Sequence, residues 1–134
     1  MTRLEERYEG NFLEAIDLPE GAHVPVVIEA IADPDTQKDG AGKTIRKAIV
    51  AFKGKGKRLI LGKTNYRVLK AMLGADRAKW IGQTVQLQRR YLPAERAFGV
   101  PNELCIRVVP PHGTPIPKSA RDYMGTTRPQ EVTR

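Results

Sequence analysis

The sequence over residues 44–73 is TIRKAIVAFKGKGKRLILGKTNYRVLKAML, and its hydrophobic period changes partway along. Residues 44–53 and 57–61 are rich in apolar side chains and flank a short turn with two glycines, which predicts two strands in a hairpin. Apolar residues then recur at helical spacing around Leu69, so a helix is predicted after the hairpin, with Thr64 or Asn65 as its cap.

Strands are also predicted on both sides of this stretch. Residues 24–31 are rich in valine and isoleucine, residues 84–91 begin with polar and apolar side chains in alternation, and residues 104–109 are largely apolar. The chain is therefore predicted to be mostly β, in the order three strands, helix, two strands. That order is typical of the five-stranded Greek-key barrel known as the OB fold, with its helix between strands 3 and 4.

The predicted barrel covers residues 23–110 and is flanked by two segments of different composition. Residues 1–22 are expected to form an N-terminal arm that contains one short helical turn. Residues 111–134 are rich in proline and poor in large apolar side chains, which predicts an extended C-terminal tail without a core of its own. We expect this tail to be separable from the barrel.

Length and composition suit one folded domain in the cytoplasm. The chain has 134 residues, of which 40% are hydrophobic, as is ordinary for a globular protein. No run of 18 apolar residues is present, so no membrane partner is expected. The charged N-terminus lacks the apolar stretch of a signal peptide. The single cysteine, Cys105, lies in an apolar run that is typical of a core residue.

Basic charge is concentrated in the middle of the chain. The net charge is +8, yet residues 1–42 carry 3 basic and 10 acidic residues, whereas residues 43–107 carry 16 basic and 3 acidic ones. Such a concentration of cations attracts polyanions, and nucleic acid is the commonest polyanion in a cell. The alternative is that the charge serves only solubility.

Motifs for catalysis, metal binding or nucleotide binding are weak. The two Gly-Lys-Thr triplets, at 42–44 and 62–64, lack the upstream glycine of a phosphate-binding loop. The aspartates within residues 33–39 are not followed by the carboxylate that a calcium loop needs at its twelfth position. His23 and His112 have no neighbouring zinc ligand. We therefore expect a protein that is not an enzyme and has no metal or cofactor.

Basic and aromatic residues are interleaved on the predicted strands and loops, as in proteins that bind single strands by contacting phosphates and stacking on bases. The candidate nucleic-acid-binding residues are Lys43, Arg46, Phe52, Lys53, Arg58, Arg89, Arg90, Tyr91, Arg96 and Phe98. Phe98 lies between an alanine and a glycine in a predicted loop and is the strongest candidate for stacking. For Phe52 and Tyr91 the alternative is a place in the core, with only the charged side chains exposed.

Several short motifs within residues 11–110 carry a family resemblance. They are Asn11-Phe12-Leu13, Phe52-Lys53-Gly54, Gly62-Lys63-Thr64-Asn65, Trp80-Ile81-Gly82 and Arg107-Val108-Val109-Pro110. On these motifs the chain resembles small OB-fold proteins of bacteriophages and prophages, some of which bind single-stranded DNA. The resemblance implies a role in phage DNA metabolism in the host cytoplasm, and it implies no catalytic residue. Residues 130–134 differ from the acidic tip by which bacterial single-strand-binding proteins recruit partners.

Two functions therefore stand as expectations. The first is binding of single-stranded nucleic acid, either DNA or RNA and most simply single-stranded DNA, in phage replication or recombination. The alternative is a structural or assembly protein of a virus, which would use the barrel and the tail for protein contacts. Either function leaves room for a homo-oligomer or a phage protein partner bound through residues 111–134, where apolar and aromatic side chains would anchor the contact.

Overall fold

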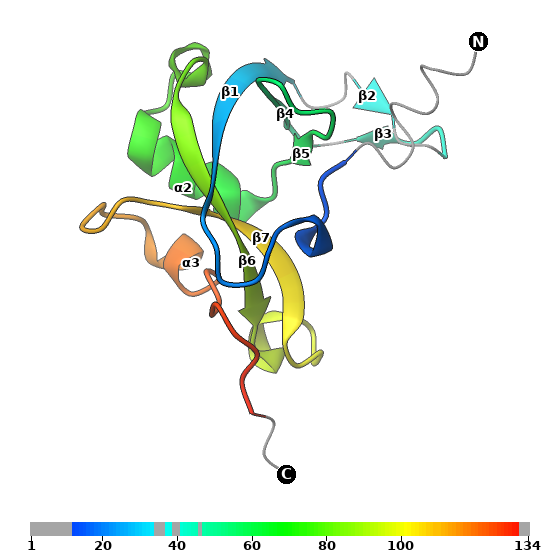
Figure 1. Ribbon diagram of the computed structural model, residues 1–134, viewed down its shortest axis with the longest axis vertical. Coiled ribbons are helices and arrows are strands. Elements are labelled where there is room, and N and C mark those ends of the chain that lie inside the picture. The colour runs from blue at the N-terminus through cyan, green and yellow to red at the C-terminus, as the bar shows by residue number, and fades with distance from the viewer. Residues whose placement is uncertain (1–11, 34–36, 39–40, 46, 132–134) are drawn as a thin grey trace.

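The computed structural model describes residues 12–33, 37–38, 41–45 and 47–131 (Figure 1). The strands are β1 (Val24–Ala32), β2 (Gln37–Lys38), β3 (Thr44–Ile45), β4 (Ile49–Phe52), β5 (Leu59–Ile60), β6 (Thr84–Leu92) and β7 (Glu103–Val109). The helices are α2 (Lys63–Leu73), α3 (Lys118–Arg121) and three 3-10 turns, η1 (Ala15–Asp17), η2 (Arg77–Trp80) and η3 (Ala94–Arg96). In these described parts of the chain, none of the helices is long and apolar enough to span a bilayer.

Five strands form one antiparallel sheet in the order β5-β4-β1-β6-β7. The prediction of a mostly β chain with few helices is confirmed. The sheet is open, because β5 and β7 lie at its two edges and do not pair with each other in the described chain. Closure into a barrel is therefore not observed, and one reason is that β5 contains only two residues.

The N-terminal segment 12–18 lies along the open side of the sheet. The backbone N–H of Leu13 donates to the carbonyl oxygen of Arg58 at 2.7 Å, which attaches the segment beside β5. The turn η1 lies against β6 and β7 at the other edge, and Leu18 is buried in the core. The segment that was expected to be an arm outside the barrel thus bridges the gap between the two edge strands.

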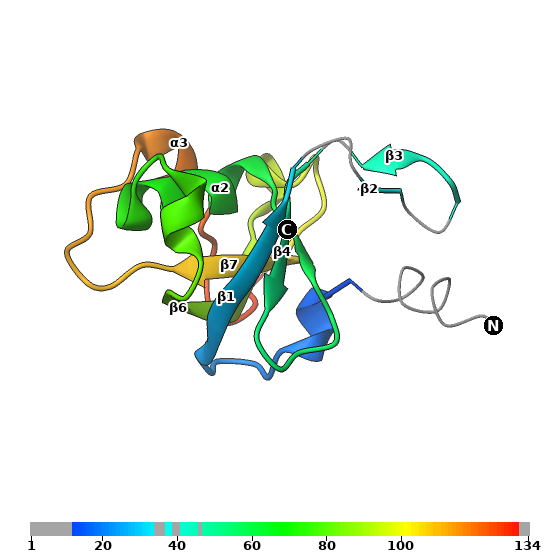
Figure 2. The ribbon, with the colours of Figure 1, turned by 90° about the horizontal axis from the view of Figure 1, so that it is seen from above.

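The predicted strand over residues 44–53 is divided in two. Its first part is β3, which pairs with β2 in a separate two-stranded ribbon rather than in the main sheet. Figure 2 shows this ribbon projecting to one side, away from α2 and α3. Only the second part, β4, pairs with β1, because the apolar side chains that fill the core begin at Ala48.

The core lies between the sheet and α2. Val68 and Leu69 of the helix are buried against strand residues such as Ile28, Leu87 and Val108. Asn65 is also buried and ties the helix to β7, since its Nδ2 donates to the carbonyl oxygen of Ile106 and its Oδ1 accepts from the N–H of Val108, both at 2.9 Å. The prediction that Thr64 or Asn65 caps this helix is wrong, because the cap position is occupied by Gly62.

Residues 111–131 do not form a wholly extended tail. They include α3, which lies beside α2 (Figure 2), and Ala120 of this helix has no exposed surface. Thr126 forms an antiparallel bridge with Tyr91 of β6. Gly125, the residue before Thr126, has a φ of +72°, and a Cβ at this position would lie 2.6 Å from the carbonyl oxygen of Tyr91. Only glycine therefore lets the C-terminal segment come this close to β6. The boundary at residue 110 stays a prediction.

Candidate nucleic-acid interface

The nine candidate residues that the structure describes do not gather on one surface. Figure 1 shows the β4–β5 hairpin in the upper half of the molecule and the loop between β6 and β7 at the lower end of these two strands. Lys53 and Arg58 belong to the hairpin, and Arg96 and Phe98 belong to the distant loop. Lys43 is exposed next to the β2–β3 ribbon. Arg46 lies outside the described residues.

Two of the candidate aromatic residues are part of the core. Phe52 is 3% exposed and Tyr91 is 8% exposed. The Tyr91 hydroxyl also donates to the Glu20 carboxylate, which fixes the ring in place. Neither ring has a face free to stack on a base, so the alternative of a core position for both is the one that the structure supports.

The arginines of β6 and β7 hold other parts of the chain against the sheet. Arg89 donates from Nε and Nη2 to the carbonyl oxygen of Leu18, at 3.0 and 2.7 Å. Arg90 donates to the side-chain oxygen of Gln88 at 2.7 Å and more weakly to the carbonyl oxygens of Met124 and Gly125.

Arg107, which was not among the candidates, makes a similar contact from β7. Its Nε donates to the carbonyl oxygen of Tyr123 at 2.6 Å. Burial lowers the pKa of both Arg90 and Arg107. Arg89 thus binds a backbone oxygen of the N-terminal segment, Arg90 and Arg107 bind backbone oxygens of the C-terminal segment, and all three side chains are partly buried.

The loop between β6 and β7 offers one fully exposed ring. Phe98 has its whole side chain in solvent and a φ of +53°, which is unusual for a residue other than glycine. The neighbouring Arg96 lies 3.8 Å from the Asp122 carboxylate, and its guanidinium carbon lies 5.3 Å from the centroid of the Tyr123 ring. The exposure predicted for Phe98 agrees with the structure, whereas Arg96 shares its charge with an acid and a ring.

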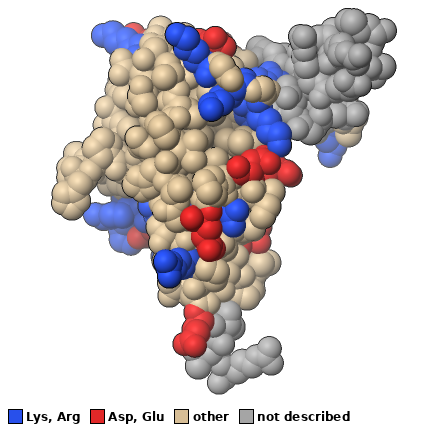
Figure 3. Space-filling view, in the orientation of Figure 1, with Lys and Arg blue, Asp and Glu red and all other residues tan. Residues whose placement is uncertain are grey.

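The turn of the β4–β5 hairpin presents lysines to solvent. Lys53, Lys55 and Lys57 are all exposed, and Figure 3 shows a band of basic side chains over this part of the molecule. Lys57 pairs with Asp17 at 3.0 Å. The pKa of Asp17 is lowered by the backbone N–H of Glu14 and by this lysine. Within the described chain, Lys53 and Lys55 have no acidic partner.

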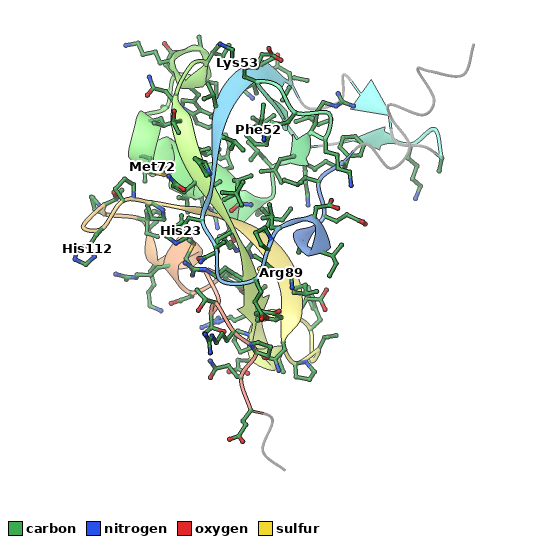
Figure 4. All side chains as sticks on the ribbon, in the orientation of Figure 1. His23, Phe52, Lys53, Met72, Arg89 and His112 are labelled. Carbon is green, nitrogen blue, oxygen red and sulfur yellow. The ribbon has the colours of Figure 1, made fainter. Side chains whose placement is uncertain are left out.

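An apolar cavity of about 250 Å³ opens beside these lysines. Its walls come from η1, β1, β4 and β6, and its rim includes Lys55, Gly56 and Lys57. The apolar lining residues are Leu13, Leu18, Val24, Val26, Phe52 and Leu87. Figure 4 shows Phe52 and Lys53 at this end of the molecule and Arg89 well below them. Apolar surface thus lies next to Lys55, which has no acidic partner in the described chain.

A second group of cations lies at the other end of the hairpin. Lys47 precedes β4, Lys63 begins α2, and Arg77 begins η2; together with Tyr66 they line a groove of about 650 Å³. Sequence reasoning missed this groove, because its residues come from three separate segments of the chain, 47–48, 61–66 and 75–77. The one signal that points to it is charge: residues 40–75 contain no acidic residue. Their ten basic residues are Lys43, Arg46, Lys47, Lys53, Lys55, Lys57, Arg58, Lys63, Arg67 and Lys70.

Two observations concern metal binding and thiol chemistry in the described chain. No group of three or more His, Cys, Asp or Glu residues is placed there so that it could hold a metal ion. Burial raises the pKa of the Cys105 thiol, which disfavours the reactive thiolate. Comparison with protein-family models, with curated proteins and with solved structures finds no significant match to this chain, so its function is argued from its own residues.

Proposed function

We propose that this protein binds single-stranded nucleic acid, most simply single-stranded DNA, along the β4–β5 hairpin. One observation carries the proposal: Lys53 and Lys55 at the turn of the hairpin are exposed and have no acidic partner in the described chain, and they lie inside a stretch of 36 residues, 40–75, that contains no acid. Cations in such an arrangement raise the local concentration of a polyanion and bind its phosphates. Lys53 and Lys55 are the residues that we assign to this contact.

The apolar cavity beside the turn favours a single strand over a duplex. In a duplex the bases are stacked inside and only their edges and the phosphates can be reached. In a single strand a base can turn away from its neighbours and place its flat faces on apolar surface while its phosphate meets a lysine. Lys55, at the rim of the cavity, supplies that pairing of cation and apolar wall.

An OB-type sheet is part of the proposal. The five strands of the main sheet occur along the chain as β1, β4, β5, β6 and β7, and α2 lies between the third and the fourth of them. OB domains bind oligonucleotides on the face of their second and third strands. Here those strands are β4 and β5, and the turn that joins them carries the lysines. A role in phage DNA replication or recombination is proposed only on the strength of the sequence resemblance.

The test is a comparison of strand binding by fluorescence anisotropy. We expect a labelled single strand of about 16 nucleotides to bind more tightly than the duplex of the same sequence at 150 mM salt. The double variant Lys53→Ala/Lys55→Ala should weaken single-strand binding several-fold. Its matched control, Lys70→Ala/Arg128→Ala, removes the same charge from exposed positions away from the turn and should change binding little.

Two results would count against the proposal. Equal affinity for the single strand and the duplex would mean that the cavity has no part in recognition. Equal loss of affinity in the two double variants would mean that the protein responds only to net charge and that the hairpin is not a site.

A further inference from the structure

We infer that the groove bounded by Lys47, Lys63, Arg77 and Tyr66 binds a nucleoside monophosphate unit, namely the phosphorylated end of a strand. Binding of a strand end in this groove rests on the proposed function, whereas binding of an isolated mononucleotide does not. The groove is separate from the lysines of the turn, since it lies where β4 begins and β5 ends. The four residues of β4 separate the two places by about 13 Å at the usual rise of a strand.

The charge of the groove matches a phosphate monoester. Lys47 and Lys63 are exposed, and no acidic partner for either lies in the described chain. Arg77 forms an ion pair with Asp33 at 3.0 Å, and the Arg77 side chain is 36% exposed. Three cations and one acid leave a net charge of about +2, and a phosphate monoester carries about −1.5 to −2 at neutral pH. A phosphate inside a strand carries only one negative charge, so a terminal phosphate fits the groove better.

An aromatic ring lies in the same groove. Tyr66 is half-buried, and its ring packs at a tilt against Trp80, with 5.8 Å between the ring centroids. Trp80 is fully buried and its Nε1 donates to the carbonyl oxygen of Gly74, so the ring behind Tyr66 is held firmly. A half-buried aromatic ring with a rigid support is the kind of surface on which a base stacks.

The size of the groove agrees with this ligand. Its volume of about 650 Å³ lies within the range of about 300–1,000 Å³ that is usual for small-molecule sites. The lining also includes Ala48, Leu61 and Ala75, which provide apolar contact beside the charged side chains. The groove therefore combines a cationic side, a ring and apolar walls in a volume large enough for one nucleotide.

The first experiment uses dAMP and deoxyadenosine with the full chain, followed by NMR of the backbone amides. We expect dAMP to shift the amides of Lys63 and Tyr66, and deoxyadenosine to bind at least about tenfold more weakly because it has no phosphate. The variant Lys47→Ala/Lys63→Ala should lose dAMP binding by a similar factor. The variant Lys53→Ala/Lys55→Ala, altered only at the turn, should keep it.

The second experiment distinguishes a free nucleotide from the end of a strand. A single strand with a 5′- or 3′-terminal phosphate should bind more tightly than the same strand with hydroxyl ends, and the difference should vanish in Lys47→Ala/Lys63→Ala. If dAMP binds the groove but the terminal phosphate adds nothing to strand affinity, the ligand is a free nucleotide and the strand-end assignment is overturned.

The remaining outcomes separate this inference from the proposed function. If millimolar dAMP leaves the groove amides unshifted while the strand still binds through the turn, the inference is wrong and the proposed function stands. If dAMP binds the groove with the expected dependence on Lys47 and Lys63 but no strand binds, the nucleotide site stands and the proposed function is wrong.

Discussion

The β4–β5 hairpin and the β6–β7 pair are both rich in basic residues, but they use them differently. On β6 and β7 the guanidinium groups of Arg89, Arg90 and Arg107 donate to backbone oxygens of the flanking segments. At the hairpin turn Lys53 and Lys55 extend into solvent without acidic partners in the described chain. A count of basic residues alone would not distinguish the two regions.

The difference follows from the side chains themselves. An arginine presents five donors in a planar fork and is more weakly hydrated than an ammonium group, so it can be held among backbone carbonyls. A lysine is a compact and strongly hydrated charge on a flexible stem, which favours an exposed position. The arginines therefore stabilise the packing of the flanking segments on the sheet, and the lysines remain exposed to solvent.

Removal of residues 111–134 should have the largest effect. It would take away the buried Ala120 and the backbone oxygens that accept from Arg90 and Arg107, leaving half-buried guanidinium groups without partners. We expect a chain that ends at Pro110 to lose about 3 kcal/mol or more of its free energy of unfolding, as measured by urea denaturation.

The sequence-based boundary at residue 110 predicts the opposite, namely a stable truncated barrel, so this experiment decides between the two. The point variant Gly125→Ala offers a milder form of the same test. Because a Cβ at this position would lie 2.6 Å from the carbonyl oxygen of Tyr91, it should displace the segment and lower stability without deleting any residue. Unchanged unfolding in both proteins would show that residues 111–134 are separable.

The variant Arg107→Ala should lower stability by about 1.5–3 kcal/mol, since it removes a charged donor from the Tyr123 carbonyl oxygen. Thermal melting would measure the loss. Strand affinity of the folded fraction should stay within about twofold of the unaltered protein, because this guanidinium faces the chain and not solvent. A variant with normal stability and weak strand binding would place Arg107 in the interface instead.

The variant Phe98→Ala tests whether the distant loop also contacts the strand. The ring is fully exposed, so its removal should change stability by no more than about 0.5 kcal/mol. If the ring stacks on a base, a strand of about 16 nucleotides that spans both regions should lose about 1–3 kcal/mol of binding. A strand of about 4 nucleotides bound at the hairpin should be unaffected. Equal losses for both lengths would contradict the separation of the two regions.

The variant Asp17→Asn should have the smallest effect. It removes the partner of Lys57 and so adds a third available lysine to the turn. We expect the salt dependence of single-strand binding to steepen by at most about 0.7, the contribution of one phosphate contact. Anisotropy titrations at several salt concentrations would detect this change, and an unchanged dependence would show that Lys57 does not reach the strand.

Local patterns explain how much of the fold could be predicted. The hairpin over residues 49–60 and the helix that follows it depend on glycine positions and apolar spacing, which the sequence displays directly. The division of the strand into β3 and β4 depends on which residues meet the core, and the packing of α3 depends on α2, 45 or more residues earlier. Proline content alone gave no sign of the buried Ala120.

The candidate site was predictable only in part for the same reason. The flanking Ala97 and Gly99 are small loop residues, and Phe98 is indeed exposed. Nothing in the spacing of Arg89 and Arg90 reveals that backbone oxygens of Leu18 and Gly125 accept their hydrogen bonds. The groove at Lys63 is assembled from distant segments, so its charge balance became visible only when those segments were placed together.

The most direct test of the central claim is the salt dependence of single-strand binding in two matched double variants. Lys53→Ala/Lys55→Ala alters the hairpin turn, and Arg96→Ala/Arg128→Ala removes the same charge near the β6–β7 loop and from the C-terminal segment. The slope of log affinity against log salt should flatten by about 1.4 in the first variant, the equivalent of two phosphate contacts, and stay unchanged in the second. A flatter slope in the second variant with no change in the first would place the phosphates on the other region and contradict the account.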